Sequence, residues 1–280
     1  MRVFAWVLAA ALGAGASGLR AQELAPFITT PDEVVTAMLK MAGTRDTDFV
    51  MDLGSGDGRI VIAAARQFGA RGLGVDLNER LVRESQQTAR AAGVADRVQF
   101  EARDVLRTDL SRASVVTIYL LPDLMAQLRE KMLKELKPGS RIVAHLFVFP
   151  GWAPDRTEVV RITKPHQGQG EESRISLWVV PVDVFGNWRA AAPAGGGEWR
   201  LRLLQNFQYL DLDGTAGGAP VEAVSGRVDG ERVSFEARAR VEGRMTPVRF
   251  EGRAAGARIV GELAVGEGAG AKKVPFVLER

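Results

Sequence analysis

Short apolar runs alternate with segments of helical spacing between about residues 26 and 182, and this alternation constrains the fold more than any other feature. Four segments have helical spacing, and a capping-box pattern at Thr30-Pro31-Asp32-Glu33 opens the first; they are residues 31–42, 59–68, 79–92 and 123–136. The apolar runs span residues 49–53, 72–77, 98–102, 115–121, 142–147, 159–162 and 175–180. Strands joined through helices form parallel sheets that are covered on both faces. We therefore expect an α/β domain with a seven-stranded, mostly parallel sheet that binds ligands at the carboxyl ends of its strands.

The chain changes character after about residue 184, where a period of two replaces the helical spacing. Apolar and charged residues alternate strictly over residues 232–241, so one face of this strand is apolar. Asp229-Gly230 and Glu242-Gly243 lie where hairpin turns are required. We expect residues 184–280 to form a small antiparallel β domain, a barrel or half-barrel of six to eight strands, whose apolar face is core. The segment 190–197 is either a linker from the first domain, residues 22–183, or the first loop of the second.

The first 21 residues have the layout of a signal peptide. A single cation at Arg2 precedes an apolar run that ends near Gly18, and small residues surround a cleavage position after Ala21. An uncleaved membrane anchor is the alternative. Both interpretations predict an exported protein whose folded part lies in the periplasm, and after cleavage no later segment is apolar and long enough to cross a membrane.

The composition excludes several kinds of chemistry. The sequence has no Cys and only two His, His145 and His166, so we expect no metal site and no cysteine nucleophile. The formal net charge of +3 disfavours a nucleic-acid-binding surface.

A buried strand runs into a glycine-rich turn at Phe49–Gly58, with the sequence FVMDLGSGDG. Glycines on alternate positions allow a sharp bend and bring backbone N–H groups close to a ligand. The dinucleotide pattern G-x-G-x-x-G would require glycine at position 59, where this chain has Arg59. Asp52 would repel a pyrophosphate and suits a cationic ligand, so the turn favours a nucleoside with a sulfonium or zwitterionic tail.

Acidic residues also end the next two strands. Asp76 is placed to accept hydrogen bonds from ribose hydroxyls, and Asp104 from an adenine amino group, while the backbone N–H of Val105 would donate to a ring nitrogen. The fourth strand ends at the centre of the sheet, and we expect Tyr119 and Pro122 to face the substrate there.

With these motifs the chain resembles class I S-adenosylmethionine (SAM) dependent methyltransferases over about residues 26–182, which implies a Rossmann-like sheet. More narrowly, it resembles the small seven-strand protein-lysine methyltransferases that modify the ATP synthase c subunit and the adenine nucleotide translocase. The similar stretches are Thr29-Thr30-Pro31, DLGSGDGRIV at residues 52–61, residues 75–78, residues 92–94, and VAHLFVFPGWAP at residues 143–154.

The resemblance implies a SAM cofactor and a role for each matching residue. The methionine and sulfonium part would lie among Asp52, Gly54, Ser55, Gly56, Asp57 and Gly58, the ribose beside Asp76 and Asn78, and the adenine beside Asp104 and Val105. Thr29 and Thr30 would close the pocket, and Tyr119 to Pro122 would lie beside the transferred methyl group. Asp76 departs from the usual Glu of the lysine subgroup, and Y-L-L-P lacks the Asn/Asp-Pro-Pro-aromatic signature of DNA adenine and glutamine methyltransferases.

We expect a protein lysine as the acceptor, with Tyr119 aligning the amine and no dedicated general base. The predicted acceptor mouth comprises Tyr119, Leu121, Pro122, His145 and Trp152. His145 could instead be a strand-end histidine bonded to the backbone, and Trp152 could pack in a lid. Two other functions stay open: an exported, non-catalytic nucleoside-binding or SAM-binding envelope protein, and a small-molecule methyltransferase. In the leading hypothesis the β domain would be a module that docks the enzyme to its substrate or to a surface, with association to the envelope as one such role.

Overall fold

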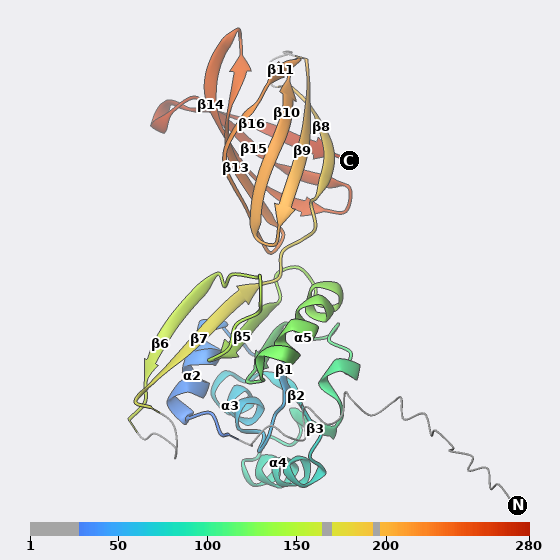
Figure 1. Cartoon of the computed structure of the whole chain (residues 1–280), viewed down its shortest axis with the longest axis vertical. Coiled ribbons are helices and arrows are strands. Elements are labelled where there is room, and N and C mark those ends of the chain that lie inside the picture. The colour runs from blue at the N-terminus through green and yellow to red at the C-terminus, as the bar shows by residue number, and fades with distance from the viewer. Residues whose placement is uncertain (1–27, 164–169, 193–196) are drawn as a thin grey trace, which may run out of the picture.

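The computed structural model describes residues 28–163, 170–192 and 197–280, and in it the chain forms an α/β domain followed by a β-barrel (Figure 1). The predicted signal peptide and the loop that holds His166 lie outside the described residues. Within the described ranges, no helix has the length and apolar character needed to cross a bilayer.

The seven strands of the first domain are ordered β3-β2-β1-β4-β5-β7-β6. They are β1 (Phe49–Leu53), β2 (Arg71–Asp76), β3 (Val98–Ala102), β4 (Val115–Ile118), β5 (Arg141–His145), β6 (Arg156–Arg161) and β7 (Glu172–Val179). All neighbours pair in parallel except β7, which is antiparallel to both β5 and β6. This confirms the predicted sheet, and the carboxyl ends of β1 to β5 share one edge.

Within the described residues, helix α2 (Asp32–Met41) precedes β1. Three helices and a 3₁₀ turn connect successive strands: α3 (Arg59–Phe68), α4 (Glu79–Ala91), α5 (Pro122–Glu135) and η1 (Val105–Arg107). Alternate strand residues enter different cores. Val50 and Val115 pack with α2 and α3, whereas Met51 and Val116 pack with α5. Helices therefore cover both faces, as the alternation predicts.

The predicted capping box at the start of α2 is wrong. Pro31 is the N-cap, no side chain caps the helix, and the hydroxyl of Thr30 contacts the His145 ring 3.3 Å away. The local pattern fails because a residue distant in sequence competes for the hydroxyl that would have made the cap.

The second domain is a closed antiparallel barrel of eight strands with a short ninth, β11 (Ala219–Pro220), paired to β10. The barrel strands are β8 (Gly186–Ala191), β9 (Glu198–Asn206), β10 (Tyr209–Ala216), β12 (Glu222–Asp229), β13 (Arg232–Val241), β14 (Arg244–Ala255), β15 (Arg258–Val265) and β16 (Lys272–Glu279), with a 3₁₀ turn η3 (Gly268–Gly270). The pairing of β9 with β10 closes the ring. Because β8 pairs with β9 up to Ala191 and Glu198, the chain between these two residues joins two strands of the barrel and is not a linker between the domains; residues 193–196 themselves lie outside the described residues.

Large side chains fill the barrel. Trp188, Trp199, Phe235, Phe250 and Phe276 are all buried in one cluster, so the apolar face is core as predicted. The predicted turns are present as well: Gly230 has φ 58°, and Glu242 and Gly243 have φ 50° and 81°.

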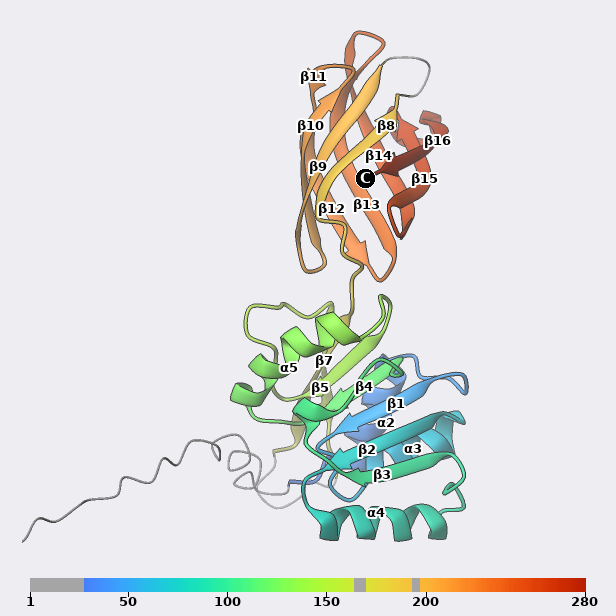
Figure 2. The same ribbon diagram turned by 90° about the vertical axis from the view of Figure 1, so that its right-hand side faces the viewer.

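The barrel contacts the α/β domain at the amino ends of the strands (Figure 2). The amide of Val182, just after β7, donates to the carbonyl of Gly230 in the β12–β13 turn at 2.8 Å. Arg227 of β12 pairs with Asp155, the residue before β6. Because β5 and β6 begin, and β7 ends, at this edge, the barrel lies opposite the glycine-rich turn.

Candidate active site

The glycine-rich turn after β1 exposes backbone at close range. Gly54, Gly56 and Gly58 have φ values of 81°, 53° and 78°, which only glycine adopts without strain. A Cβ atom on Gly54 would lie 2.8 Å from Leu120 Cδ2. The buried hydroxyl of Ser55 is one of two buried side-chain polar atoms without a hydrogen-bond partner among the described residues. The turn thus holds a polar group that a ligand could satisfy.

Asp52 at the end of β1 is a nearly isolated buried carboxyl group. It is 3% exposed, and Thr117 Oγ1 on β4 donates to Asp52 Oδ1 at 2.7 Å. Burial, reinforced by the nearby Asp57 and Asp76 carboxylates and opposed by the Thr117 bond, raises the pKa of Asp52 to about 7. A cation placed beside Asp52 would reverse this shift.

Asp76 at the end of β2 is half-buried and contacts the turn directly. Its Oδ2 accepts from the amide of Gly56 at 2.9 Å, and its Oδ1 accepts from the amide of Asn78 at 2.8 Å. Each carboxylate oxygen keeps a lone pair for a further donor. The exposed Asn78 is placed differently: its side chain caps α4 by accepting from the amides of Arg80 and Leu81.

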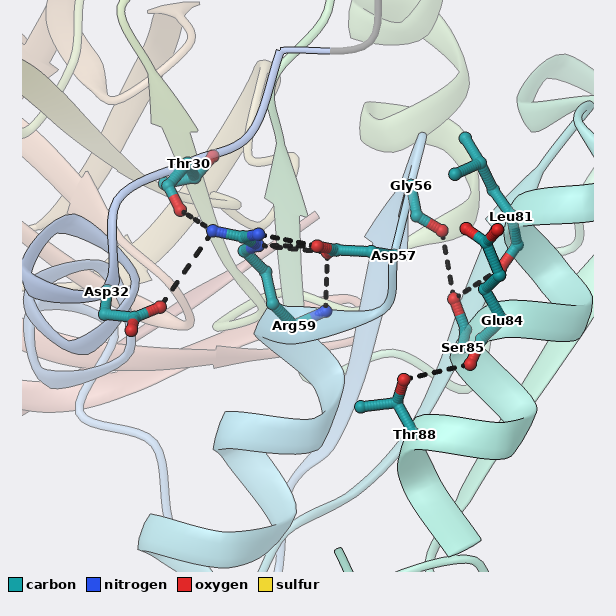
Figure 3. A network of polar contacts seen from close by, with 9 residues as sticks. All are labelled: Thr30, Asp32, Gly56, Asp57, Arg59, Leu81, Glu84, Ser85 and Thr88. Atoms are coloured by element: carbon teal, nitrogen blue, oxygen red, sulfur yellow. Dashed lines mark hydrogen bonds and ion pairs between the residues drawn. The ribbon is translucent and has the colours of Figure 1, made fainter. Parts of the chain in front are cut away.

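Asp57 is committed to an ion pair. The Arg59 guanidinium donates to the Asp57 carboxylate through Nε at 3.0 Å and Nη2 at 2.6 Å (Figure 3). Arg59 Nη1 also donates to the carbonyl of Thr30 at 2.8 Å, which ties the N-terminal segment to the turn. No sequence motif assigns this role to Arg59. The one signal in the sequence is that an arginine stands at position 59, where the dinucleotide pattern G-x-G-x-x-G would have its third glycine.

Ser85 on α4 also supports the turn. Its hydroxyl lies 3.0 Å from the carbonyl of Gly56 and 2.9 Å from that of Leu81 (Figure 3). No sequence motif predicts this contact, because it joins elements that are adjacent only in the fold.

Asp104 follows β3 at the same edge of the sheet. Its Oδ1 accepts from the amide of Leu106 at 2.9 Å and so caps η1, of which the buried Val105 is the first residue. The second carboxylate oxygen lies 3.9 Å from Arg107 Nε, an exposed group.

Tyr119 and Pro122 follow β4 at the centre of this edge. Tyr119 is half-buried, its ring centroid lies 4.2 Å from that of His145 and 6.2 Å from that of Phe147, and burial raises the pKa of its hydroxyl. Pro122 is the first residue of α5, and Leu121 before it is exposed. Tyr119, Leu121 and Pro122 thus follow β4 at this edge, and their role at an acceptor mouth stays a prediction.

His145 at the end of β5 is buried against the Tyr119 ring. Its Nδ1 lies 3.3 Å from Thr30 Oγ1, and its Nε2 is hydrogen-bonded to Ser173 Oγ on β7. Burial lowers its pKa to about 4, so the ring is neutral at physiological pH. Its partners are two hydroxyl groups and not the backbone. Thr30 is buried as well, and Thr29 beside it is partly buried.

The structure places Trp152 away from these residues, in the junction with the barrel. It is 1% exposed, its Nε1 donates to Gln208 Oε1 at 2.9 Å, and its ring stacks on Phe207 at 5.3 Å. Asp155, which follows it closely, leads into β6 at the amino edge. Trp152 therefore packs in the domain junction and does not lie beside Tyr119, where the sequence predicts it.

This edge brings together a glycine-rich turn, carboxyl groups at the ends of three successive strands and the half-buried Tyr119 after the fourth, which defines a class I SAM-dependent methyltransferase. Comparisons agree: residues 52–156 match the model of the ANTKMT methyltransferase domain. A protein-lysine N-methyltransferase of Saccharolobus islandicus (strain REY15A) is 40% identical over 138 residues, which are 49% of this chain and 84% of that protein. The chain belongs to this family of methyltransferases.

Other relatives share the same region. A lysine N-methyltransferase of Xenopus laevis, named for the C subunit of ATP synthase, is 40% identical over 130 residues, 46% of this chain and 57% of that protein. The crystal structure of an RNA methyltransferase from Salinibacter ruber with S-adenosyl-L-homocysteine is 42% identical, with a TM-score of 0.50 over 56% of this chain and 96% of that one. The chain therefore spans little more than half the length of the animal relative, and its β-barrel lies outside the part matched by the family model.

The residues present fit SAM. The orphaned Ser55 hydroxyl lies in the turn, where the three glycines place no side chain between the backbone and a ligand. The buried Asp52 carboxyl group suits a neighbouring cation. The cofactor of this enzyme is SAM.

Proposed function

We propose that this enzyme transfers the methyl group of SAM to the side-chain amine of a protein lysine. The observation that carries the proposal is the half-buried Tyr119 ring, packed against the buried neutral His145 with the uncharged Leu121 and Pro122 close behind it in the chain. An ammonium group has no lone pair, so the acceptor must lose its proton before transfer, and apolar surroundings lower the pKa of a lysine. The names of the archaeal and Xenopus laevis relatives support lysine as the acceptor.

Bound SAM supplies an activated methyl group on a sulfonium centre. Asp52 would hold its positive end, Ser55 and the amides of the turn its amino-acid part, Asp76 the ribose, and Asp104 with Val105 the adenine. Tyr119, with Leu121 and Pro122 beside it, would orient the amine toward the methyl group and exclude water. Positioning supplies most of the acceleration in such a reaction, which explains why no general base is required.

We also propose that the protein is exported, because residues 1–21 have the layout of a signal peptide. Its acceptor would then be an envelope protein, and SAM would have to reach it from the cytosol. The barrel would associate with the envelope without contacting the transferred methyl group, since it contacts the opposite edge of the sheet.

The first experiment titrates SAM calorimetrically into the chain from Gln22 onward, with Asp76→Ala as the matched variant. The substitution removes a charge-assisted contact of about 1.5 to 3 kcal/mol, so we expect SAM affinity to fall at least about tenfold. Equal affinity would show that Asp76 is not in the cofactor site. A folded protein that does not bind SAM would contradict the assignment of the cofactor.

The second experiment incubates the enzyme with SAM labelled in the methyl group and an envelope extract. Protease-sensitive label that co-migrates with methyl-lysine after hydrolysis supports the proposal. Label sensitive to ribonuclease would favour RNA, since the Salinibacter ruber relative is named an RNA methyltransferase. Label in small molecules would favour a metabolite acceptor, and SAM binding without transfer would favour a binding protein.

A further inference from the structure

We propose that Arg59 and His145 are positioning residues that hold Thr30 from two sides and thereby fix the N-terminal segment against the SAM site. We call Thr30, Arg59 and His145 the Thr30 clamp. The inference rests on SAM binding and not on the identity of the methyl acceptor.

Arg59 forms the first side of the clamp. Its guanidinium binds the Asp57 carboxylate with Nε and Nη2 and donates from Nη1 to the carbonyl of Thr30 at 2.8 Å (Figure 3). The Asp57 bonds raise the pKa of Arg59, so its charge is permanent. Only a planar group with donors on several sides can make both contacts at once, and lysine cannot replace it. Any movement of the glycine-rich turn at Asp57 therefore reaches Thr30 directly.

His145 forms the second side. A neutral imidazole donates from one nitrogen and accepts at the other, and a hydroxyl can do either. The contacts with Thr30 Oγ1 and Ser173 Oγ can therefore exist together in either tautomer. The same ring lies against Tyr119, with 4.2 Å between centroids. His145 thus links the N-terminal segment to the residue at the acceptor mouth.

The sheet order explains why one residue can connect both parts of the site. β4 lies between β1 and β5, and it leads directly into Tyr119. Thr30 contacts a residue that follows the turn after β1 and a residue that ends β5, so its two anchors flank the end of β4. The buried Thr30 has both its carbonyl and its hydroxyl engaged. A ligand that orders the turn will consequently order residues 28–31 and the surroundings of Tyr119 as well.

The test combines calorimetry of SAM binding with hydrogen exchange of the backbone amides of residues 28–41. Thr30→Val keeps the shape of the side chain and the carbonyl bond to Arg59 but removes the bond to His145. His145→Phe keeps a ring against Tyr119 and removes both hydrogen bonds. Arg59→Lys keeps the positive charge beside Asp57 but removes the planar guanidinium, whose donors reach Asp57 and Thr30 together. Thr36→Val and Arg80→Lys are matched controls, because Thr36 bonds Gln67 and Arg80 pairs with Glu84 on helix surfaces.

In the wild type, SAM should slow amide exchange in residues 28–36. Each clamp variant should weaken SAM binding about five- to twentyfold and lose most of this SAM-dependent protection. Arg59→Lys combined with Thr30→Val should weaken binding less than the product of the single effects, because both act through Thr30. The controls should match the wild type in both measurements.

Two results would overturn the clamp. One is a clamp variant that melts at a lower temperature but binds SAM normally and keeps full SAM-dependent protection, which would make these contacts ordinary packing. The other is wild-type binding of SAM without any change in exchange at residues 28–36. If His145→Phe does not fold, the milder Thr30→Val decides. A wild type that does not bind SAM at all is a separate result, since it contradicts the cofactor and not the clamp.

Discussion

The two edges of the α/β sheet are built from the same strands but differ in how their polar groups are used. At the carboxyl edge, among the residues that the structure describes, the buried Asp52 has one side-chain hydrogen-bond partner and the Ser55 hydroxyl has none. At the amino edge, the buried Gln208 makes two side-chain hydrogen bonds in the junction with the barrel. Its Oε1 accepts from Trp152 Nε1, and its Nε2 donates to the carbonyl of Ala153 at 2.7 Å. The carboxyl edge thus keeps two buried polar groups with one partner or none, whereas the polar side chains of the barrel junction are satisfied. Outside that junction, the amino edge holds one buried group without a partner among the described residues, the hydroxyl of Thr44 in the loop before β1.

This difference shows where the molecule sacrifices stability for function. A five-residue strand is about 16 Å long, so the two edges are well separated. An uncommitted buried polar group destabilises the folded chain and persists where a ligand uses it. Substitutions at the carboxyl edge should therefore change ligand binding more than folding, and substitutions at the amino edge should do the opposite.

The largest expected effect is at the amino edge. Trp152→Ala removes a fully buried ring that stacks on Phe207 and Phe149, and we expect it to lower the free energy of unfolding by about 3 to 5 kcal/mol. SAM affinity should stay within about twofold of the wild type, because about 16 Å of strand separate the edges. Chemical denaturation and SAM calorimetry on the same protein check both parts. Weaker SAM binding without loss of stability would break the comparison and return Trp152 to the acceptor mouth.

Asp52→Asn tests the carboxyl edge, where we expect the opposite result: weaker SAM binding without a loss of stability. The amide keeps the shape and the bond from Thr117 but cannot balance a cation, so SAM affinity should fall at least about thirtyfold, or about 2 kcal/mol. Folding should improve at pH 8, because the variant no longer buries a carboxylate. Calorimetry and urea unfolding measure the two effects. A variant that is both less stable and able to bind SAM normally would contradict the assignment of Asp52 to the site.

The pKa of Asp52 also predicts a pH dependence. Because this pKa is raised to about 7, the empty folded protein holds a proton that the unfolded chain, with an ordinary value of 3.8, has released at pH 5 to 6. The contribution of Asp52 to stability therefore falls as pH rises from about 4 to 7 and levels off above 7. SAM should bind about tenfold more weakly at pH 6 than at pH 8, since its cation requires the ionised form. Asp52→Asn should flatten this dependence, and an equally steep profile in the variant would assign it to another group.

The sequence predicts the parts of the molecule that depend on local periodicity. Helix α2, expected at residues 31–42, spans Asp32–Met41, and α3 spans residues 59–68 as expected. The ends of β1, β2 and β3 place Asp52, Asp76 and Asp104 along one edge because parallel strands end together. Strand-end acids are therefore accessible to sequence reasoning.

Contacts between residues distant in sequence were not accessible in this way. Thr30 has the pattern of a helix cap, but its hydroxyl contacts His145, 115 positions away. The sequence predicts that Trp152 lines the acceptor mouth, but in the structure its ring N–H donates to Gln208, 56 positions later. Nothing in the local pattern specifies these partners, because each depends on how β5 or the barrel packs.

Backbone strain gives a finer comparison of the edges. Phe207 at the amino edge has φ 53°, and Leu146 at the carboxyl edge, just after His145, has φ 64°. The ring of Phe207 stacks on Trp152, so packing offsets its strain. The side chain of Leu146 is 41% exposed and has no comparable support. The strained turn brings His145 and Phe147 against Tyr119, with centroids 4.2 and 6.2 Å away.

Leu146→Gly measures this strain and is the smallest effect we predict. Glycine adopts a positive φ freely, which should gain about 1 kcal/mol and offset the loss of about 0.5 to 1 kcal/mol from the greater freedom of the unfolded chain. Leu121→Gly is the matched control, because Leu121 is 47% exposed at the same edge but has φ −65°. Urea unfolding should show a loss only for Leu121→Gly. Equal losses in the free energy of unfolding would show that the backbone at Leu146 stores no strain.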